Sequence, residues 1–199
     1  TDIFLVGDAH QRIYGKPVIM SHCGINIRGR SRKLRINYRT TEEIRNWAVS
    51  VLSGQNIDDL DGGRDDLLAY KSLLHGLNPT IENFELQEEE ANYLVTAVES
   101  LLLDDVPPES ICVTARKHRQ VEAYREAFQS AGIETCLLAS HSGDDSDQPG
   151  VRFATMHRVK GLEFAHVLIA GANERDVPPF SLESAYGFDL LQLSLIHIS

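Results

Sequence analysis

Short apolar runs alternate along the chain with stretches of helical periodicity. The apolar runs predict strands over residues 2–6, 81–86, 111–115, 133–139, 151–155 and 166–171. The periodic stretches predict helices over residues 40–53, 88–103 and 117–131. Repeated strand–helix–strand units of this kind imply an α/β fold, in which helices cover both faces of a parallel sheet.

Two smaller expectations concern the first helix and the loop behind it. Thr40 and Glu43 stand three residues apart at the start of the first helix, which is the spacing of a capping box. Residues 55–79 are rich in glycine and aspartate at first and then mixed. We expect a loop there, with a short helix near residues 65–75.

Polar residues follow directly where predicted strands end. Gly7 and Asp8 come after the first apolar run, and Thr155 closes the run at 151–155. Ligands of parallel α/β sheets sit at the carboxyl ends of the strands. These positions are therefore the first places to look for a site.

The chain has 199 residues, of which 42% are hydrophobic, enough for one domain or for one domain plus part of another. Its apolar runs are too short for a membrane span, and no signal peptide is visible, so we expect a cytoplasmic protein without membrane contact. The start at Thr1 suggests a fragment. Cys23, Cys112 and Cys136 are far apart, which favours buried reduced thiols and predicts no metal site.

Charge is distributed unevenly along the chain. The formal net charge is −10, but residues 1–50 carry nine basic and four acidic side chains, whereas residues 51–150 carry six and twenty. The basic side chains gather at Arg28, Arg30, Arg32, Lys33, Arg35 and Arg39. Such a run is either a solvated basic loop or a surface that contacts phosphates.

Three polar clusters carry the candidate chemistry, and the first two are ambiguous alone. In GDAHQ (residues 7–11), the Gln11 amide can hydrogen-bond a water and a phosphate oxygen, although a capped turn explains the same residues. In LRINYRTTEEI (residues 34–44), Tyr38 offers a ring for stacking and Arg39 a fixed charge that can stabilise a transferred phosphoryl group. The alternative is that Tyr38 packs in the core and Arg39 pairs with Glu42 or Glu43.

The third cluster, ATMHRVKGLEFAHVLIAG (residues 154–171), is long and specific. Thr155, His157 and Lys160 place a hydroxyl, an imidazole and an ammonium in one short loop, which suits a phosphate backbone. Gly161 permits a tight turn, and Glu163 can accept hydrogen bonds from a sugar hydroxyl.

Taken together and in order, the clusters resemble the UvrD/Rep-like superfamily 1 DNA helicases. VGDAHQRIYG is similar to their motif III (GDxxQxIY), and LRINYRTTEEI to motif IV (NYR followed by Ser or Thr). VRFATMHRVKGLEFAHVLIAG is similar to motif V (TxHxxKGLEF), the most specific of the three. The stretch ICVTARKHRQVEAYREAFQSAGI also matches the strand–helix pair between motifs IV and V. The resemblance covers roughly residues 2–175.

The resemblance implies a RecA-like P-loop NTPase fold of two lobes, with ATP and Mg²⁺ between them and single-stranded DNA across their tops. The implied parent is an ATP-dependent 3′-to-5′ DNA helicase or translocase. Gln11 would then sense the γ-phosphate and the attacking water, Arg39 would be the arginine finger, and Tyr38 would stack on adenine. Glu163 would bind the ribose, beside Gly161 in the same nucleotide-contacting motif. The residues implied to contact DNA are Thr155, His157, Lys160 and, nearby, Tyr14.

The same resemblance predicts how the chain is divided. Residues 1–30 would end the first lobe, with Asp8 holding the motif III loop, and residues 31–192 would form most of the second lobe. The loop at 140–150 leaves no room for a large accessory insertion. Residues 193–199 (LSLIHIS) resemble translated sequencing adaptor, so we exclude them from fold reasoning.

Several departures limit this hypothesis. The P-loop and the acidic pair that holds magnesium are expected upstream of Thr1, and motif VI downstream, so we expect the fragment to be inactive alone. Motif III also departs from the family pattern, because GKPVIMSHCGINIRGR follows Ile13 and Tyr14. One alternative is a degenerate helicase lobe that serves as a non-catalytic DNA-binding or interaction module, and another is a fusion to a nuclease.

Overall fold

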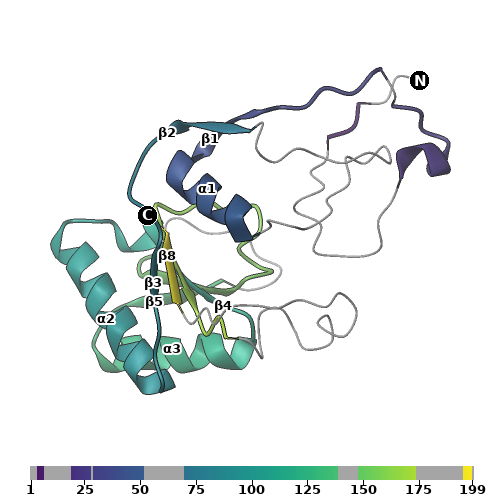
Figure 1. The fold of residues 1–199 in the computed structure, drawn as a ribbon. Coiled ribbons are helices and arrows are strands. Elements are labelled where there is room, and N and C mark those ends of the chain that lie inside the picture. Colours follow the sequence, from purple (N-terminus) through teal and green to yellow (C-terminus); the bar gives the residue numbers. More distant parts are fainter. Residues whose placement is uncertain are drawn as a thin grey trace. The chain divides into compact units, whose positions relative to one another are not determined.

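The computed structural model describes the backbone and side chains of residues 4–6, 19–27, 29–51, 70–138 and 148–173, and the backbone of 195–198. These residues belong to two compact units, Thr1–Asn78 and Pro79–Ser199 (Figure 1). We call them the first and the second unit and describe each by itself.

The first unit contains a strand, a helix and a second strand that pairs with the first. Its elements are the 3₁₀ helix η1 (Met20–Cys23), β1 (Ile36–Thr41), α1 (Glu42–Val51) and β2 (Lys71–Leu74). β1 and β2 pair in parallel. Parallel strands need a crossover between them, and α1 lies in that connection.

The predicted helix over 40–53 begins later than expected. Thr40 and Thr41 are the last residues of β1, so α1 starts at Glu42. The Thr41 Oγ1 accepts a hydrogen bond from the Ile44 backbone N–H at 3.3 Å. Thr41 therefore caps the helix, and the predicted capping box of Thr40 and Glu43 is wrong.

Two other expectations for the first unit are wrong where the structure describes them. Residues 71–74 form β2 rather than a helix, because pairing with β1 satisfies their backbone, while 65–69 lie outside the described residues. Residues 4–6 are exposed and form no strand, with Phe4 92% exposed. A buried strand needs a neighbour, and none of the described strands pairs with them.

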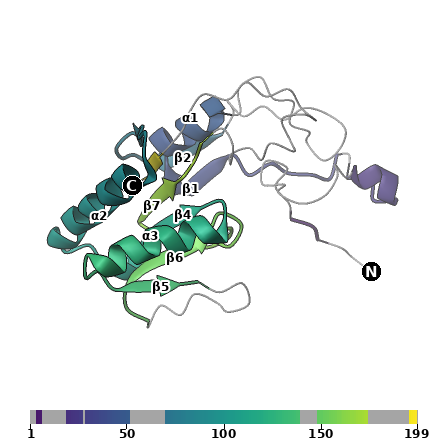
Figure 2. The same ribbon diagram turned by 90° about the horizontal axis from the view of Figure 1, so that it is seen from below.

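The second unit consists of one β-sheet with helices packed against it. Its elements are β3 (Thr80–Glu82), α2 (Gln87–Leu103), η3 (Pro108–Ser110), β4 (Ile111–Ala115), α3 (His118–Ser130), β5 (Thr135–Leu137), β6 (Val151–Thr155), β7 (His166–Ala170) and β8 (Leu195–Ile198). The strand order is β3-β8-β7-β4-β6-β5, and β5, β6, β4 and β7 pair in parallel (Figure 2). The predicted parallel sheet with helices is confirmed.

An apolar core joins α2, α3 and the sheet. Leu94 and Val98 from α2 pack with Phe128 from α3 and Phe153 from β6, and all four are fully buried. The Phe128 and Phe153 rings meet edge to face, with centroids 5.0 Å apart. Every residue of β4 is buried, as expected for a central parallel strand. The two described helices of this unit share one core cluster, so they lie on one face of the sheet.

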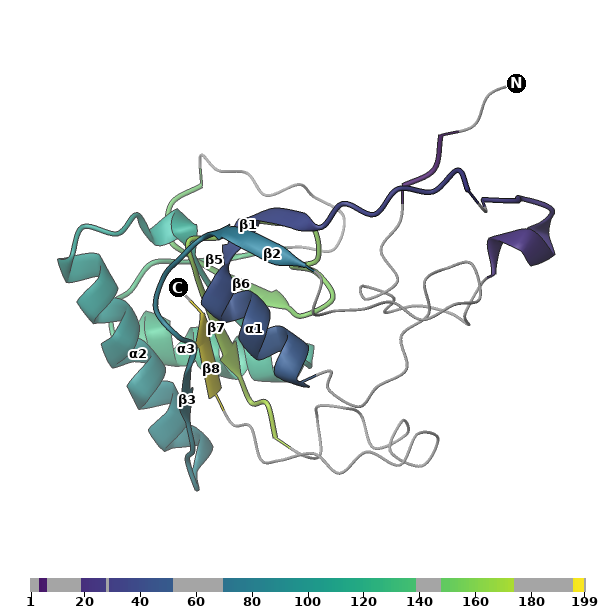
Figure 3. The ribbon, with the colours of Figure 1, turned by 45° about the horizontal axis from the view of Figure 1, so that its top comes forward.

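Residues 195–198 belong to the segment that the sequence analysis excluded from fold reasoning. They form β8, which pairs antiparallel with both β3 and β7 (Figure 3). β8 thus separates β3 from the parallel strands. The origin of residues 193–199 stays a prediction.

The three cysteines are free thiols. Cys112 and Cys136 are buried, as predicted, whereas Cys23 is exposed. The prediction is wrong for Cys23 because this residue lies in η1, which has no buried residue.

Candidate nucleotide and nucleic-acid interface

The end of β1 holds the predicted nucleotide contacts Tyr38 and Arg39. The Asn37 Oδ1 accepts a hydrogen bond from the Arg39 backbone N–H at 2.8 Å, and the Asn37 Nδ2 donates to the Thr40 Oγ1 at 2.5 Å. An asparagine that bonds the backbone two residues on forms an Asx turn, so Asn37 bends the strand at these residues.

Strand pairing is interrupted at the same place. Asn37 faces Ser72 and Thr41 faces Leu74, so residues 38–40 of β1 lie opposite Leu73 alone. This is an irregularity of the bulge type, which turns side chains away from the regular pleat. Tyr38 is 67% exposed, and the alternative that it packs in the core is wrong. Arg39 is also exposed.

Two consecutive glutamates at the start of α1 accept hydrogen bonds from the backbone of β2 and of the segment that follows it. The Ser72 N–H donates to the Glu42 Oε2 at 2.6 Å, and the Gly76 N–H donates to the Glu43 Oε2 at 2.9 Å. We call these two glutamates, together with the two N–H groups that donate hydrogen bonds to them, the acid clamp.

Each glutamate of the acid clamp also has a basic partner. Arg45 donates to both oxygens of Glu42, at 2.8 and 2.5 Å, and the His75 Nδ1 lies 3.0 Å from the Glu43 Oε1. The bond from Arg45 lowers the pKa of Glu42 to about 2, and the Ser72 N–H adds to this effect. The His75 contact and the Gly76 N–H lower the pKa of Glu43 as well. Hydrogen bonds to the charged carboxylate produce shifts in this direction.

In the second unit, Thr155 ends β6 and residues 156–165 form the loop that follows. The Thr155 carbonyl accepts hydrogen bonds from the N–H groups of Arg158 (2.8 Å) and Val159 (3.2 Å), which starts a tight turn. Gly161 has a φ of +89°, in the left-handed region that favours glycine.

Apolar contacts anchor this loop while its polar residues stay accessible. Leu162 and Phe164 pack against the small cluster of Cys136, Leu138 and Ala154. Thr155 and His157 are half-buried, and Lys160, Gly161 and Glu163 are exposed. The predicted DNA contacts and the predicted ribose contact of this motif are therefore brought together in one loop.

The structure adds Arg116, which the sequence analysis missed. Its Nη1 lies 2.6 Å from the Nδ1 and 3.1 Å from the Nε2 of His157. Arg116 follows β4, the neighbour of β6 in the sheet. Applying the strand-end rule to the run at 111–115 would have found it.

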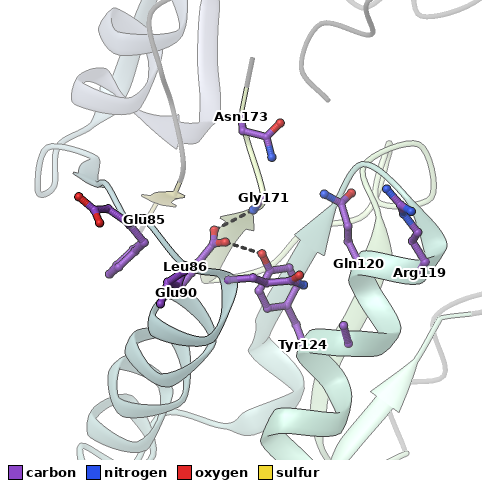
Figure 4. Close-up of a pocket in the computed structure, with 11 residues that line it drawn as sticks. Glu85, Leu86, Glu90, Arg119, Gln120, Tyr124, Gly171 and Asn173 are labelled. Atoms are coloured by element: carbon purple, nitrogen blue, oxygen red, sulfur yellow. Dashed lines mark hydrogen bonds between the residues drawn. The ribbon is translucent and has the colours of Figure 1, made fainter. Parts of the chain in front are cut away.

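A second feature that sequence reasoning missed is a pocket of about 530 Å³ between the first turns of α2 and α3 (Figure 4). Glu90, only 5% exposed, accepts hydrogen bonds there from the Tyr124 hydroxyl and, at 2.8 Å, from the Gly171 N–H. Burial raises the pKa of Glu90. Gly171, with a φ of +63°, lies where an added Cβ would approach the Gln120 Nε2 to 2.8 Å.

The remaining predicted residues are placed as follows. Gln11, Tyr14 and Asp8 lie outside the described residues. In the basic run, the residues that the structure describes are all exposed: Arg30, Arg32, Lys33, Arg35 and Arg39. No group of three His, Cys, Asp or Glu that could hold a metal ion occurs in the described part of the chain.

The β1–α1 segment and the β4–α3 segment both fall within one family match. The family model for UvrD-like helicase C-terminal domains matches residues 32–142, more than half of the 199-residue chain. The chain belongs to this family. The match includes Tyr38, Arg39 and the acid clamp, whereas residues 155–165 lie beyond it.

Membership of the UvrD-like helicase family supports the resemblance drawn from the motifs and the RecA-like α/β architecture of the second lobe. No match was found among curated proteins or among solved structures. In the described ranges, no helix is both long and apolar enough to cross a membrane.

Proposed function

We propose that this chain forms part of an ATP-dependent 3′-to-5′ DNA helicase or translocase, in which Tyr38 and Arg39 contact ATP and Thr155, His157 and Lys160 contact single-stranded DNA. The observation that carries the proposal is the family match over 32–142. It covers the bent end of β1 at which the tyrosine ring and the arginine stand exposed.

For ATP, the local geometry provides an exposed aromatic ring next to a permanent positive charge. A ring at this place can stack on a base, and an arginine can stabilise charge on a transferred phosphoryl group. Gln11 would sense the γ-phosphate, and Glu163 with Gly161 would contact the ribose. Mg²⁺ would accompany the ATP phosphates, held by residues of the first lobe.

For DNA, the loop after β6 combines a hydroxyl with cationic groups at the carboxyl edge of a parallel sheet. Thr155, His157 and Lys160 supply donors for phosphate oxygens, and Arg116 contacts the His157 ring. Tyr14 would add a contact from the first lobe. Single-stranded DNA is the partner that this chemistry fits.

The test is ATP hydrolysis by the complete protein that includes the P-loop lobe, with and without single-stranded DNA. We expect DNA to stimulate hydrolysis and Arg39→Ala to lower kcat by about 10³-fold or more, as for arginine fingers. Gln11→Ala should also abolish most turnover.

Arg125→Ala is the matched control, because in the described part of the chain Arg125 pairs with Glu122 on α3 at 2.7 Å and with the Thr135 hydroxyl on β5 at 3.3 Å, both in the second unit. Turnover near the wild-type value in both Arg39→Ala and Gln11→Ala would refute the assignment. DNA binding without any hydrolysis in the complete protein would instead favour a non-catalytic DNA-binding module.

A further inference from the structure

We propose that Glu42 and Glu43 are positioning residues: the acid clamp holds the end of β1 so that Tyr38 and Arg39 keep the place from which they would reach ATP. Neither glutamate belongs to the tyrosine–arginine pair itself. The inference rests on the proposed function only for the ligand; the placement of the two residues is a separate structural claim.

The clamp uses two neighbouring side chains for one purpose. Successive side chains of a helix point about 100° apart, so two consecutive side chains seldom contact the same strand. Here the Glu42 carboxylate reaches the Ser72 N–H within β2, and the Glu43 carboxylate reaches the Gly76 N–H just beyond it. The partners are 30 and 33 residues away along the chain, so the clamp links the start of α1 to β2 and to the residues that follow β2.

The need for such a clamp follows from the interrupted pairing of β1. Between the pairs Asn37–Ser72 and Thr41–Leu74 the register of the two strands shifts, so regular strand pairing does not fix the position of residues 38–40. Asn37 holds them from one side through its bond to the Arg39 N–H. On the other side the chain enters α1, in which Ile44 and Trp47 are half-buried and no residue is fully buried.

The clamp supplies the missing restraint on that side. Only Thr40 and Thr41 separate Arg39 from Glu42, so a shift of the first turn of α1 moves the end of β1 with it. Close packing enforces the same position, since an added Cβ on Gly76 would lie 2.9 Å from the Thr41 Cγ2. The bidentate contact of Arg45 keeps the Glu42 carboxylate oriented toward Ser72.

An alternative role is simple stabilisation, in which acids in the first turn of α1 favour the helix dipole. This role predicts that any carboxylate at these positions suffices and that Tyr38 and Arg39 are unaffected as long as α1 is folded. The positioning role depends on reach. Glu43→Asp keeps the charge but shortens the side chain by one methylene, and glutamine variants keep an acceptor oxygen without the charge.

The experiment is ¹H–¹⁵N NMR of the chain with amide hydrogen exchange, together with a measurement of ATP affinity on the complete protein that includes the P-loop lobe. In Glu42→Ala/Glu43→Ala we expect exchange at Ser72 and Gly76 to become about tenfold faster, as for loss of a hydrogen bond. The amide resonances of Tyr38 and Arg39 should shift, and ATP affinity should fall by about three- to tenfold. Glu42→Gln/Glu43→Gln keeps an acceptor for Ser72 and Gly76 but loses the charged partner of Arg45, so its changes should be smaller than those of the alanine variant. Glu43→Asp should reproduce the changes at Gly76, Tyr38 and Arg39.

Glu122→Ala is the matched control, since it removes an i,i+3 glutamate–arginine pair on α3 in the second unit. Faster exchange at Ser72 and Gly76 with unchanged Tyr38 and Arg39 resonances would overturn the proposal, and so would unchanged exchange. Failure of the proposed function looks different: the wild-type complete protein would not bind ATP, while the resonances and exchange rates of the chain and its variants would still report whether the clamp positions Tyr38 and Arg39.

Discussion

In the second unit, α2 and α3 bury Leu94 and Phe128 completely against the sheet, whereas in the first unit α1 has no buried residue. In the first unit, the acid clamp and the Thr41 cap hold the start of α1 through hydrogen bonds. The candidate DNA loop is thus anchored by apolar packing, whereas the segment that carries Tyr38 and Arg39 is anchored by hydrogen bonds. Apolar burial tolerates changes of pH, whereas carboxylate contacts do not.

The same contrast appears in the glutamates of the two units. Glu42 and Glu43 are held in their charged form by donors, so their pKa values are lowered. Glu90 is buried at the N-terminal turn of α2, so its pKa is raised although Tyr124 and Gly171 donate to it. Folding therefore favours the charged form of Glu42 and Glu43 in the first unit, whereas in the second unit it favours the protonated form of Glu90.

The largest effect should come from truncation of the core of the second unit. Phe153→Ala removes a fully buried ring that meets Phe128 edge to face, and we expect a loss of about 3–5 kcal/mol of unfolding free energy. Urea unfolding followed by far-UV circular dichroism measures it. Leu103→Ala, at a side chain 84% exposed, should change stability by less than about 0.5 kcal/mol.

The fluorescence of Trp47, the only tryptophan, reports on α1 in the same experiment. We expect its transition to move less than the dichroism signal in Phe153→Ala. Equal shifts of both signals would mean that the two units unfold as one and would contradict the comparison.

A smaller effect should follow from removing the buried acid. Glu90→Ala leaves the Tyr124 hydroxyl and the Gly171 N–H without their acceptor, at a cost of about 1–3 kcal/mol. Because the folded pKa of Glu90 is raised from 4.5, its contribution is fully present below pH 4.5 and is lost as pH rises through the folded value. Urea midpoints measured from pH 4 upward should show this decline in the wild type and a weaker one in Glu90→Gln.

The smallest effect should be the acid response of the first unit, and its sign is opposite. The pKa of Glu42 falls from 4.5 to about 2 on folding, so its contribution is present above pH 4.5 and is lost as pH falls toward 2. Trp47 emission should therefore change between these pH values. In Glu42→Gln that change should shrink, whereas in Glu122→Gln it should persist. A wild-type emission that is constant over this range would show that the clamp does not hold α1.

Predictability from sequence followed the same division between the units. The helices at 88–103 and 117–131 and the strands at 111–115, 151–155 and 166–171 match the structure closely, because their apolar periodicity records one packed face. β2 was missed because its four residues become a strand only through pairing with β1. The acid clamp was out of reach for the same reason, since its acceptors and donors are separated by 30 residues or more.

Some of what was missed did leave a signal. Glu90, Leu94 and Val98 are spaced four residues apart, so the helical pattern already placed Glu90 on the buried face. Thr41 rather than Thr40 as the cap is a shift of one residue, and helix boundaries are uncertain at that level without the tertiary pairing of β1.

The most direct test of the proposed function is a titration of single-stranded DNA into the ATPase assay of the complete protein, with Arg39→Ala and Lys160→Ala compared side by side. We expect Arg39→Ala to lose kcat at every DNA concentration while the half-saturating DNA concentration stays the same. We expect Lys160→Ala to keep kcat and to need several times more DNA, as for a lost phosphate contact, whereas Lys71→Ala on β2 should behave like wild type. Absence of DNA stimulation, or the same change of kcat in both variants, would contradict the assignment of nucleotide and DNA contacts to these two regions.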